Sequence, residues 1–168
     1  GKEHSQGIIR NKIIVGHSRF SIFLANLIIC IIVSLLCELI YLAIIFLVGT
    51  PLLGQLQMTL SQFIGILVNT IFIIISFCSI YNFVTMLCSE ITISTTICII
   101  LQEIDPNYPG DQKVKTAKII YLSIPQGQAM EIKNNNLDSL QQMTIYSIIL
   151  IVIINILGVY IFSKKELK

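Results

Sequence analysis

The chain has 168 residues and a formal net charge of +2; 55% of its residues are hydrophobic, only 12% are charged, and the mean hydropathy is +0.85. Because about 25% of the residues in a soluble domain are charged, this composition excludes a protein that faces water on all sides, and the small net charge gives no indication of a nucleic-acid partner. The sequence therefore predicts an integral membrane protein.

Basic residues gather at both ends of the chain. Four of the eleven Lys and Arg residues precede residue 20, and three lie in the terminal "KKELK". Because such flanks prefer the cytoplasm, we expect both termini inside and an even number of membrane crossings. The sequence starts without Met and without a signal-peptide pattern, which predicts an internal or C-terminal portion of a longer protein.

Residues 1–19 contain the stretch "GIIRNKIIVGHSR", in which isoleucines are interleaved with basic side chains. The pattern predicts a short interfacial helix, with Ile8, Ile9 and Ile13 forming one apolar edge. Two interpretations stay open at this point. The basic side chains can contact anionic lipid, or the apolar edge can contact a partner protein.

Three long apolar runs follow, each long enough to cross a hydrocarbon core of about 30 Å as a helix. A helix satisfies its own backbone hydrogen bonds in lipid, and the uniform apolarity of the runs differs from the alternation of barrel strands. The predicted spans cover residues 20–48, 63–87 and 143–162.

A shorter apolar run occupies residues 89–104, "SEITISTTICIILQEI". As a helix, its uncharged part from Ile91 to Gln102 would be only about 18 Å long. An even number of crossings nevertheless requires a crossing here, either short or partly re-entrant. We therefore predict an all-α polytopic membrane protein in which residues 1–168 form one transmembrane domain with about four transmembrane helices.

Residues 105–142 then form the external region between the third and fourth spans. Its "DPNYPGDQ" has the prolines, glycine and acids typical of a turn. Asn136, Asp138 or Ser139 is expected to cap the final helix.

A few polar residues interrupt the spans. Glu38 is expected to face either a substrate path or a contact between helices, because a lipid-facing carboxylate is costly. In the packing alternative it is protonated or paired with an amide side chain. Asn155 and Gly158 are expected at helix contacts, and Glu90 at a solvated turn or a partner contact. The intramembrane polar candidates are Glu38, Asn26, Asn69 and Asn155.

The sequence carries none of the common enzyme signatures, such as HExxH, GxSxG, a Walker loop or GxGxxG. The five cysteines lie in or beside apolar runs without the spacing of zinc ligands. We therefore predict no catalytic residue, no metal site, no cofactor and no enzymatic activity in this chain, so that any ATP hydrolysis requires a separate subunit.

The stretch "GIIRNKIIVGHSRFSIFLANLII" resembles the cytoplasmic segment and following helix of bacterial ABC-2 type exporter permeases, particularly the bacitracin- and lantibiotic-type group. "DPNYPG", "IPQGQAM" and "LGVYIFSKKELK" are similar to the external turn, the region before the last helix and the basic tail of that family. The four matches occur in the family's order and extend over most of the chain.

This resemblance implies a permease subunit of an ATP-driven exporter in a bacterial plasma membrane, exporting peptide antibiotics or other amphipathic substrates. The implied partners are an ABC ATP-binding subunit, a second permease half (homo- or heterodimer) and membrane lipid. Residues 7–19 would be the coupling helix that docks on the ATPase. The implied coupling residues are Ile8, Ile9, Arg10, Lys12, Ile13, His17 and Arg19.

The chain departs from the family pattern in two ways. The family usually has six spans, with two before the coupling segment, and it has a longer stretch where this chain has Glu90 to Asp105. The chain therefore resembles a C-terminal portion of such a permease. This shortened set of helices favours the alternative function, a non-transporting membrane immunity or scaffold protein.

Overall fold

The computed structural model describes residues 8–49, 59–88, 90–103, 119, 121–133 and 139–164. All regular structure within these ranges is helical, which confirms the predicted all-α class. The elements are α2 (Ile8–Ile14), α3 (Arg19–Ile44), the π-helical extension η1 (Ile45–Gly49), α5 (Leu60–Leu87), α6 (Ile91–Glu103), α8 (Pro125–Lys133) and α9 (Leu140–Lys164).

Three of these helices are long and apolar enough to cross a membrane. They cover Arg19–Val48, Leu60–Leu87 and Leu140–Lys164. These bounds match the three long spans predicted from the sequence, and the protein is a multi-pass membrane protein. With 13 residues, α6 is shorter than the other three, so the described residues contain three such helices and not four.

Local capping explains where the first helices start and stop. Gly16 has a φ of 103°, and the backbone N–H groups of Gly16 and His17 donate to the carbonyls of Ile13 (3.0 Å) and Lys12 (3.0 Å). This is the Schellman arrangement that ends a helix at glycine. Directly afterwards, the Oγ of Ser18 accepts a hydrogen bond from the Ser21 N–H (3.1 Å) and starts α3.

A capping box starts α5. The Oγ1 of Thr59 accepts from the Gln62 N–H (3.4 Å), and the Gln62 Oε1 accepts from the Thr59 N–H (3.1 Å). The start of α9 is different. Ser139 precedes that helix, but its buried Oγ has no hydrogen-bond partner among the described residues, and the other two expected caps, Asn136 and Asp138, lie outside them.

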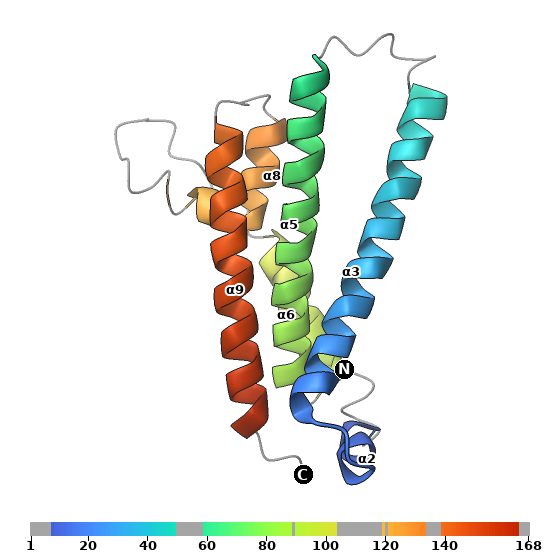
Figure 1. Cartoon of the computed structure of the whole chain (residues 1–168), viewed down its shortest axis with the longest axis vertical. Coiled ribbons are helices and arrows are strands. Elements are labelled where there is room, and N and C mark those ends of the chain that lie inside the picture. The colour runs from blue at the N-terminus through green and yellow to red at the C-terminus, as the bar shows by residue number, and fades with distance from the viewer. Residues whose placement is uncertain are drawn as a thin grey trace.

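The three long helices run side by side, with α5 in contact with both α3 and α9 (Figure 1). The buried residues of α3, namely Ile22, Phe23 and Leu27, all lie near its start. Beyond them α3 leans away from α5 (Figure 1), and its large apolar side chains are exposed. Exposed apolar side chains are expected on a helix whose solvent is lipid.

Two small cores hold the opposite ends of the bundle. Near α2, the core consists of Phe23, Met86 and Phe162, with Val159 packed against it. The predicted interhelix position Gly158 lies here: a Cβ at this residue would come within 2.6 Å of the Phe23 ring. Glycine therefore allows α3 and α9 to approach closely. At the other end, Tyr121, Leu122 and Met143 form the second core.

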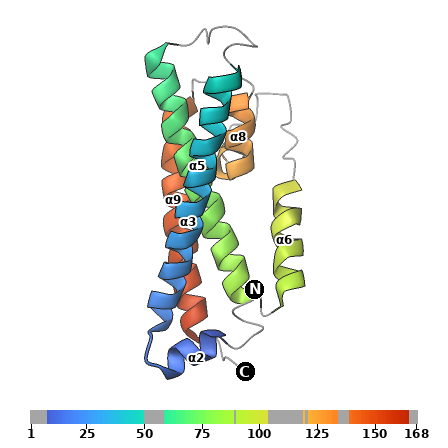
Figure 2. The same ribbon diagram turned by 90° about the vertical axis from the view of Figure 1, so that its right-hand side faces the viewer.

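The short helices α6 and α8 both pack on α5. Figure 2 shows α6 to one side of the long helices, whereas α8 lies near the end opposite α2. The expected external region, residues 105–142, is described only at 119, 121–133 and 139–142. The predicted "DPNYPGDQ" turn lies outside the described residues.

Candidate functional site

The start of α3 and the end of α9 meet through Arg19. Its Nη1 donates hydrogen bonds to the backbone carbonyls of Phe162 (3.2 Å) and Ser163 (2.9 Å). A cation at the last carbonyls of a helix is also favoured by the helix dipole. The helix α2, Arg19 and Lys164 therefore lie at the same end of the bundle (Figure 1), which we call the basic end.

The predicted coupling segment forms α2 at the basic end, and its residues divide between two surroundings. Ile13 packs against the core of Phe23, Met86 and Phe162, so it faces the bundle rather than a free edge. Among the side chains of the segment that the structure describes, the exposed apolar ones are Ile14 (72% exposed) and Val15 (78% exposed). The sequence interpretation did not single out this pair.

The remaining coupling candidates are also placed in the structure. Lys12 is half-buried and His17 is exposed. Ile8, Ile9 and Arg10 belong to α2 by their backbone, but their side chains lie outside what the structure describes. At the basic end, therefore, Ile13 packs α2 on the bundle, while Ile14 at the end of α2 and the next residue, Val15, are exposed.

A seam of polar side chains joins α5 to α9 within the spans. The Thr144 hydroxyl donates to the Asn69 Oδ1 (3.0 Å), and the Asn155 Nδ2 donates to the Ser79 Oγ (3.0 Å). Two of the predicted intramembrane polar residues thus contact another helix. Their partners were not predicted, although the polar positions 69, 76 and 79 on α5 are seven and three residues apart and share a helix face.

Glu38 and Asn26 lie on α3 and are both half-buried. Within the described part of the chain, no hydrogen bond or ion pair involves the Glu38 carboxylate. Asn69, one of the amide side chains within the spans, accepts instead from Thr144 of α9. Glu90 is exposed just before α6.

A second polar contact, at the end opposite α2, was missed from the sequence. Gln128 of α8 is 0% exposed. Its Nε2 donates to the carbonyls of Leu122 (2.7 Å) and Met143 (3.2 Å), and its Oε1 accepts from the Ser147 hydroxyl (2.7 Å). This side chain connects α8 to α9 and to the turn before α8. The only available signal was its place in "IPQGQAM".

Glu131 follows Gln128 by three residues on the same helix and is 7% exposed. Its Oε2 is buried and has no hydrogen-bond partner among the described residues. An unsatisfied buried carboxylate oxygen is costly.

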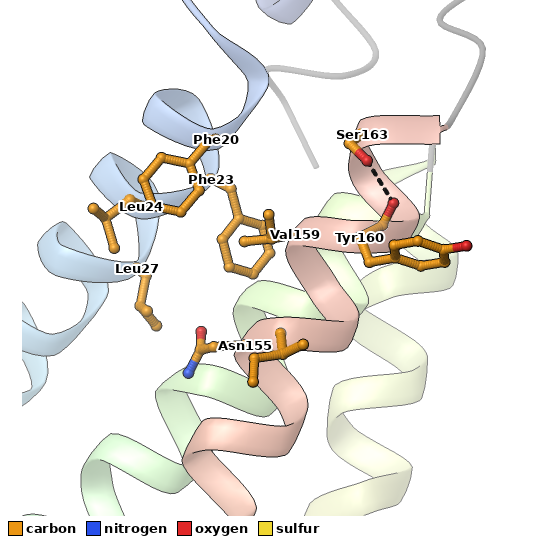
Figure 3. A pocket seen from close by; sticks show the side chains of 9 residues that line it. Phe20, Phe23, Leu24, Leu27, Asn155, Val159, Tyr160 and Ser163 are labelled. Atoms are coloured by element: carbon orange, nitrogen blue, oxygen red, sulfur yellow. Dashed lines mark hydrogen bonds between the residues drawn. The ribbon is translucent and has the colours of Figure 1, made fainter.

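An apolar groove of about 460 Å³ separates α3 from α9 near the basic end (Figure 3). Phe20, Leu24 and Leu27 line it from α3, and Val159 and Tyr160 line it from α9. The Nζ of Lys164 lies 4.4 Å from the centroid of the Tyr160 ring, and the carbonyl of groove residue Ser163 accepts from Arg19. The Tyr160 ring that carries Lys164 is directed away from α3 (Figure 3), so Arg19 is the cation that contacts a groove residue directly.

Comparisons with protein-family models, with curated proteins and with solved structures find no match for this chain.

Proposed function

We propose that this chain is the membrane-spanning permease subunit, or a portion of one, of an ATP-driven ABC-2 type exporter. The observation that carries the proposal is the segment "GIIRNKIIVGHSR", which resembles the coupling segment of that family. It forms α2 directly before a membrane helix and exposes Ile14 and Val15 beside basic residues. An exposed apolar pair on a charged helix is suited to a protein partner.

In this proposal, a separate ATP-binding subunit holds α2 and moves it during nucleotide binding and hydrolysis. Two contacts would carry that movement into the membrane. Ile13 packs α2 on the core that contains Phe23 and Phe162, and Arg19 connects the start of α3 to the end of α9. Because packed cores resist deformation, a displacement of α2 is expected to shift α3 and α9 together.

The proposed topology has four crossings, with α6 as a short or re-entrant third crossing and α2 as an interfacial helix. Both termini are then cytoplasmic in a bacterial plasma membrane, in agreement with the positive charge at the basic end. A second permease half completes the transport path, and peptide antibiotics or other amphipathic molecules are the proposed substrates. The substrate class comes from the family resemblance alone.

A non-transporting membrane immunity or scaffold protein is the second candidate. One observation favours it: Asn69 and Asn155 hydrogen-bond to the neighbouring helix and do not line an open polar path. A transporter and a scaffold can both recruit an ATP-binding subunit. ATP-dependent efflux from vesicles that contain the complex distinguishes them, since a scaffold would recruit the subunit without supporting efflux.

Charge reversal in α2 tests the coupling role. We expect the double variant Arg10→Glu/Lys12→Glu to recover several-fold less of the proposed ATP-binding subunit during co-purification, because charge-assisted contacts to the partner are lost. The matched control is Lys133→Glu, which reverses an exposed charge at the end of α8 and should leave recovery unchanged. Equal recovery with all three proteins would refute the coupling role of α2.

A further inference from the structure

Two thiols and a hydroxyl meet between α3 and α5 within the membrane-spanning part of the bundle. The Cys78 thiol of α5 donates to the Ser34 Oγ of α3 (3.3 Å), and the thiols of Cys30 and Cys78 are hydrogen-bonded to each other. Cys30 and Ser34 are four residues apart and therefore share one face of α3. This face meets the Cys78 side chain, which is 2% exposed.

Contacts on either side of this group fix the register of the two helices. Toward the basic end, the Asn82 Nδ2 donates to the Phe23 carbonyl (3.3 Å). Toward the other end, the ring centroids of Phe46 and Phe63 lie 5.8 Å apart. Because α3 and α5 run in opposite directions (Figure 1), these two contacts place the two cysteines opposite each other. The helix register thus agrees with the contact between the thiols.

The cysteine pair lies deep in the span, but one of its members is accessible. Cys30 follows Arg19, the start of α3, by eleven residues, which is about 16 Å of helix axis and near the middle of a hydrocarbon core of about 30 Å. Cys78 is buried, whereas Cys30 is only half-buried. A small uncharged oxidant, such as hydrogen peroxide, can therefore reach the Cys30 sulfur, with the Cys78 thiol in contact with it.

We propose that Cys30 and Cys78 are a redox-sensitive pair, which hydrogen peroxide converts into a disulfide between α3 and α5. First, the Cys30 sulfur attacks one peroxide oxygen and the O–O bond breaks. A sulfenic acid forms, and the thiol proton leaves with the other oxygen as water. The Cys78 sulfur then attacks the Cys30 sulfur, so that the S–S bond forms and the S–O bond breaks. The departing hydroxyl takes the Cys78 proton and forms a second water. The two thiols lose two electrons, which reduce the peroxide.

The disulfide fixes α3 to α5 at one point within the membrane. An S–S bond is about 2.05 Å long, so the two sulfurs approach beyond their hydrogen-bonded separation through rotation of the two side chains. Once the bond has formed, α3 no longer moves independently of α5. The inference depends only on these two membrane helices and holds whether or not the chain is a permease.

Counting free thiols tests the proposal. The whole chain in phosphatidylcholine vesicles is treated with hydrogen peroxide, unfolded in SDS and labelled with maleimide-linked polyethylene glycol, which slows migration in a gel once for every free thiol. The untreated protein is expected to take up five labels, one for each cysteine, and the treated protein two fewer. Reduction with dithiothreitol in SDS before labelling should restore both labels.

Serine variants identify the cysteines that react. Cys30→Ser and Cys78→Ser should each abolish the paired, reducible loss of two labels, because each removes one partner of the disulfide. Cys37→Ser is the matched control, since it removes an exposed thiol from the same helix and should leave the loss of two labels intact.

Any of three results would refute the proposal. Five labels after peroxide treatment would mean that the pair does not form a disulfide. A reducible loss of two labels that persists in Cys30→Ser would place the disulfide at other cysteines. A reducible dimer that requires Cys30 would mean that this thiol joins two copies of the chain instead of two of its helices.

Discussion

Gly127→Ala is expected to destabilise the end of the bundle opposite α2 by about 3 kcal/mol or more. A Cβ at this position would lie 2.1 Å from the carbonyl oxygen of Tyr121 and 3.0 Å from its carbonyl carbon. These are backbone atoms, and the Tyr121 carbonyl also accepts from the Ile124 N–H (3.2 Å). The clash therefore cannot be relieved by a side-chain rotation and has to displace α8 or the turn before it.

Helix propensity alone predicts the opposite effect of Gly127→Ala, an increase in stability. Gly127 lies inside α8, where alanine is favoured over glycine by about 1 kcal/mol in an isolated helix. Thermal unfolding of the purified protein in detergent measures the effect as a lowered Tm. Gly65→Ala is the matched control, because its Cβ would meet only the flexible Leu140 Cδ1 at 3.2 Å. If Gly127→Ala stabilises the protein, α8 does not pack closely on the Tyr121 carbonyl.

Gln128→Met is the second substitution with a large expected effect. The change keeps the side-chain length but removes the donor to the Leu122 and Met143 carbonyls. Met143 lies within α9, where a helical N–H still satisfies its carbonyl. The Leu122 carbonyl, before α8, loses the donor that Gln128 supplies, so we expect a loss of about 1–3 kcal/mol of unfolding free energy.

The partner hydroxyl gives this prediction a second test. Ser147 donates to the Gln128 Oε1 (2.7 Å), and it loses that acceptor in Gln128→Met. Adding Ser147→Ala to Gln128→Met should therefore cost less than it does in the unmodified protein. Gln142→Met makes the same chemical change at an exposed position of α9 and should alter the Tm little. Additive effects of the substitutions at 128 and 147 would contradict the hydrogen-bond network.

The long spans could be predicted from the sequence because lipid imposes one simple requirement. A segment such as Leu60–Leu87 must be apolar over the full thickness of the membrane, and its helical backbone then follows from hydrogen-bond satisfaction alone. The start of α3 also depends only on neighbouring residues, since Gly16 ends α2 and Ser18 caps α3. Information of this kind lies within a few neighbouring residues.

Contacts between helices could be predicted only in part. Asn69 and Asn155 stood out as costly residues in lipid, which indicated that they contact another helix, but not which one. The orientation of α2 was also ambiguous, because Ile13 and Ile14 are adjacent and equally apolar. Only packing on the core that contains Phe23 separates the inward-facing isoleucine from the exposed one.

The contact of Gln128 with α9 was not predictable from pattern alone. Gln128 lies in a stretch whose composition resembles a solvated loop, and its burial depends on residues 6 to 19 positions away in the chain. The close approach at Gly127 likewise depends on where the Tyr121 carbonyl lies in three dimensions. Tertiary structure determines both features.

Photo-crosslinking from α2 tests the proposed function most directly. A photoreactive residue is placed at Ile14, which is 72% exposed at the basic end, and at Ile149 on the exposed surface of α9 as a control. If α2 is the coupling helix, the probe at Ile14 forms an adduct with the proposed ATP-binding subunit, and the probe at Ile149 does not. Adducts to lipid alone from both positions would contradict the account.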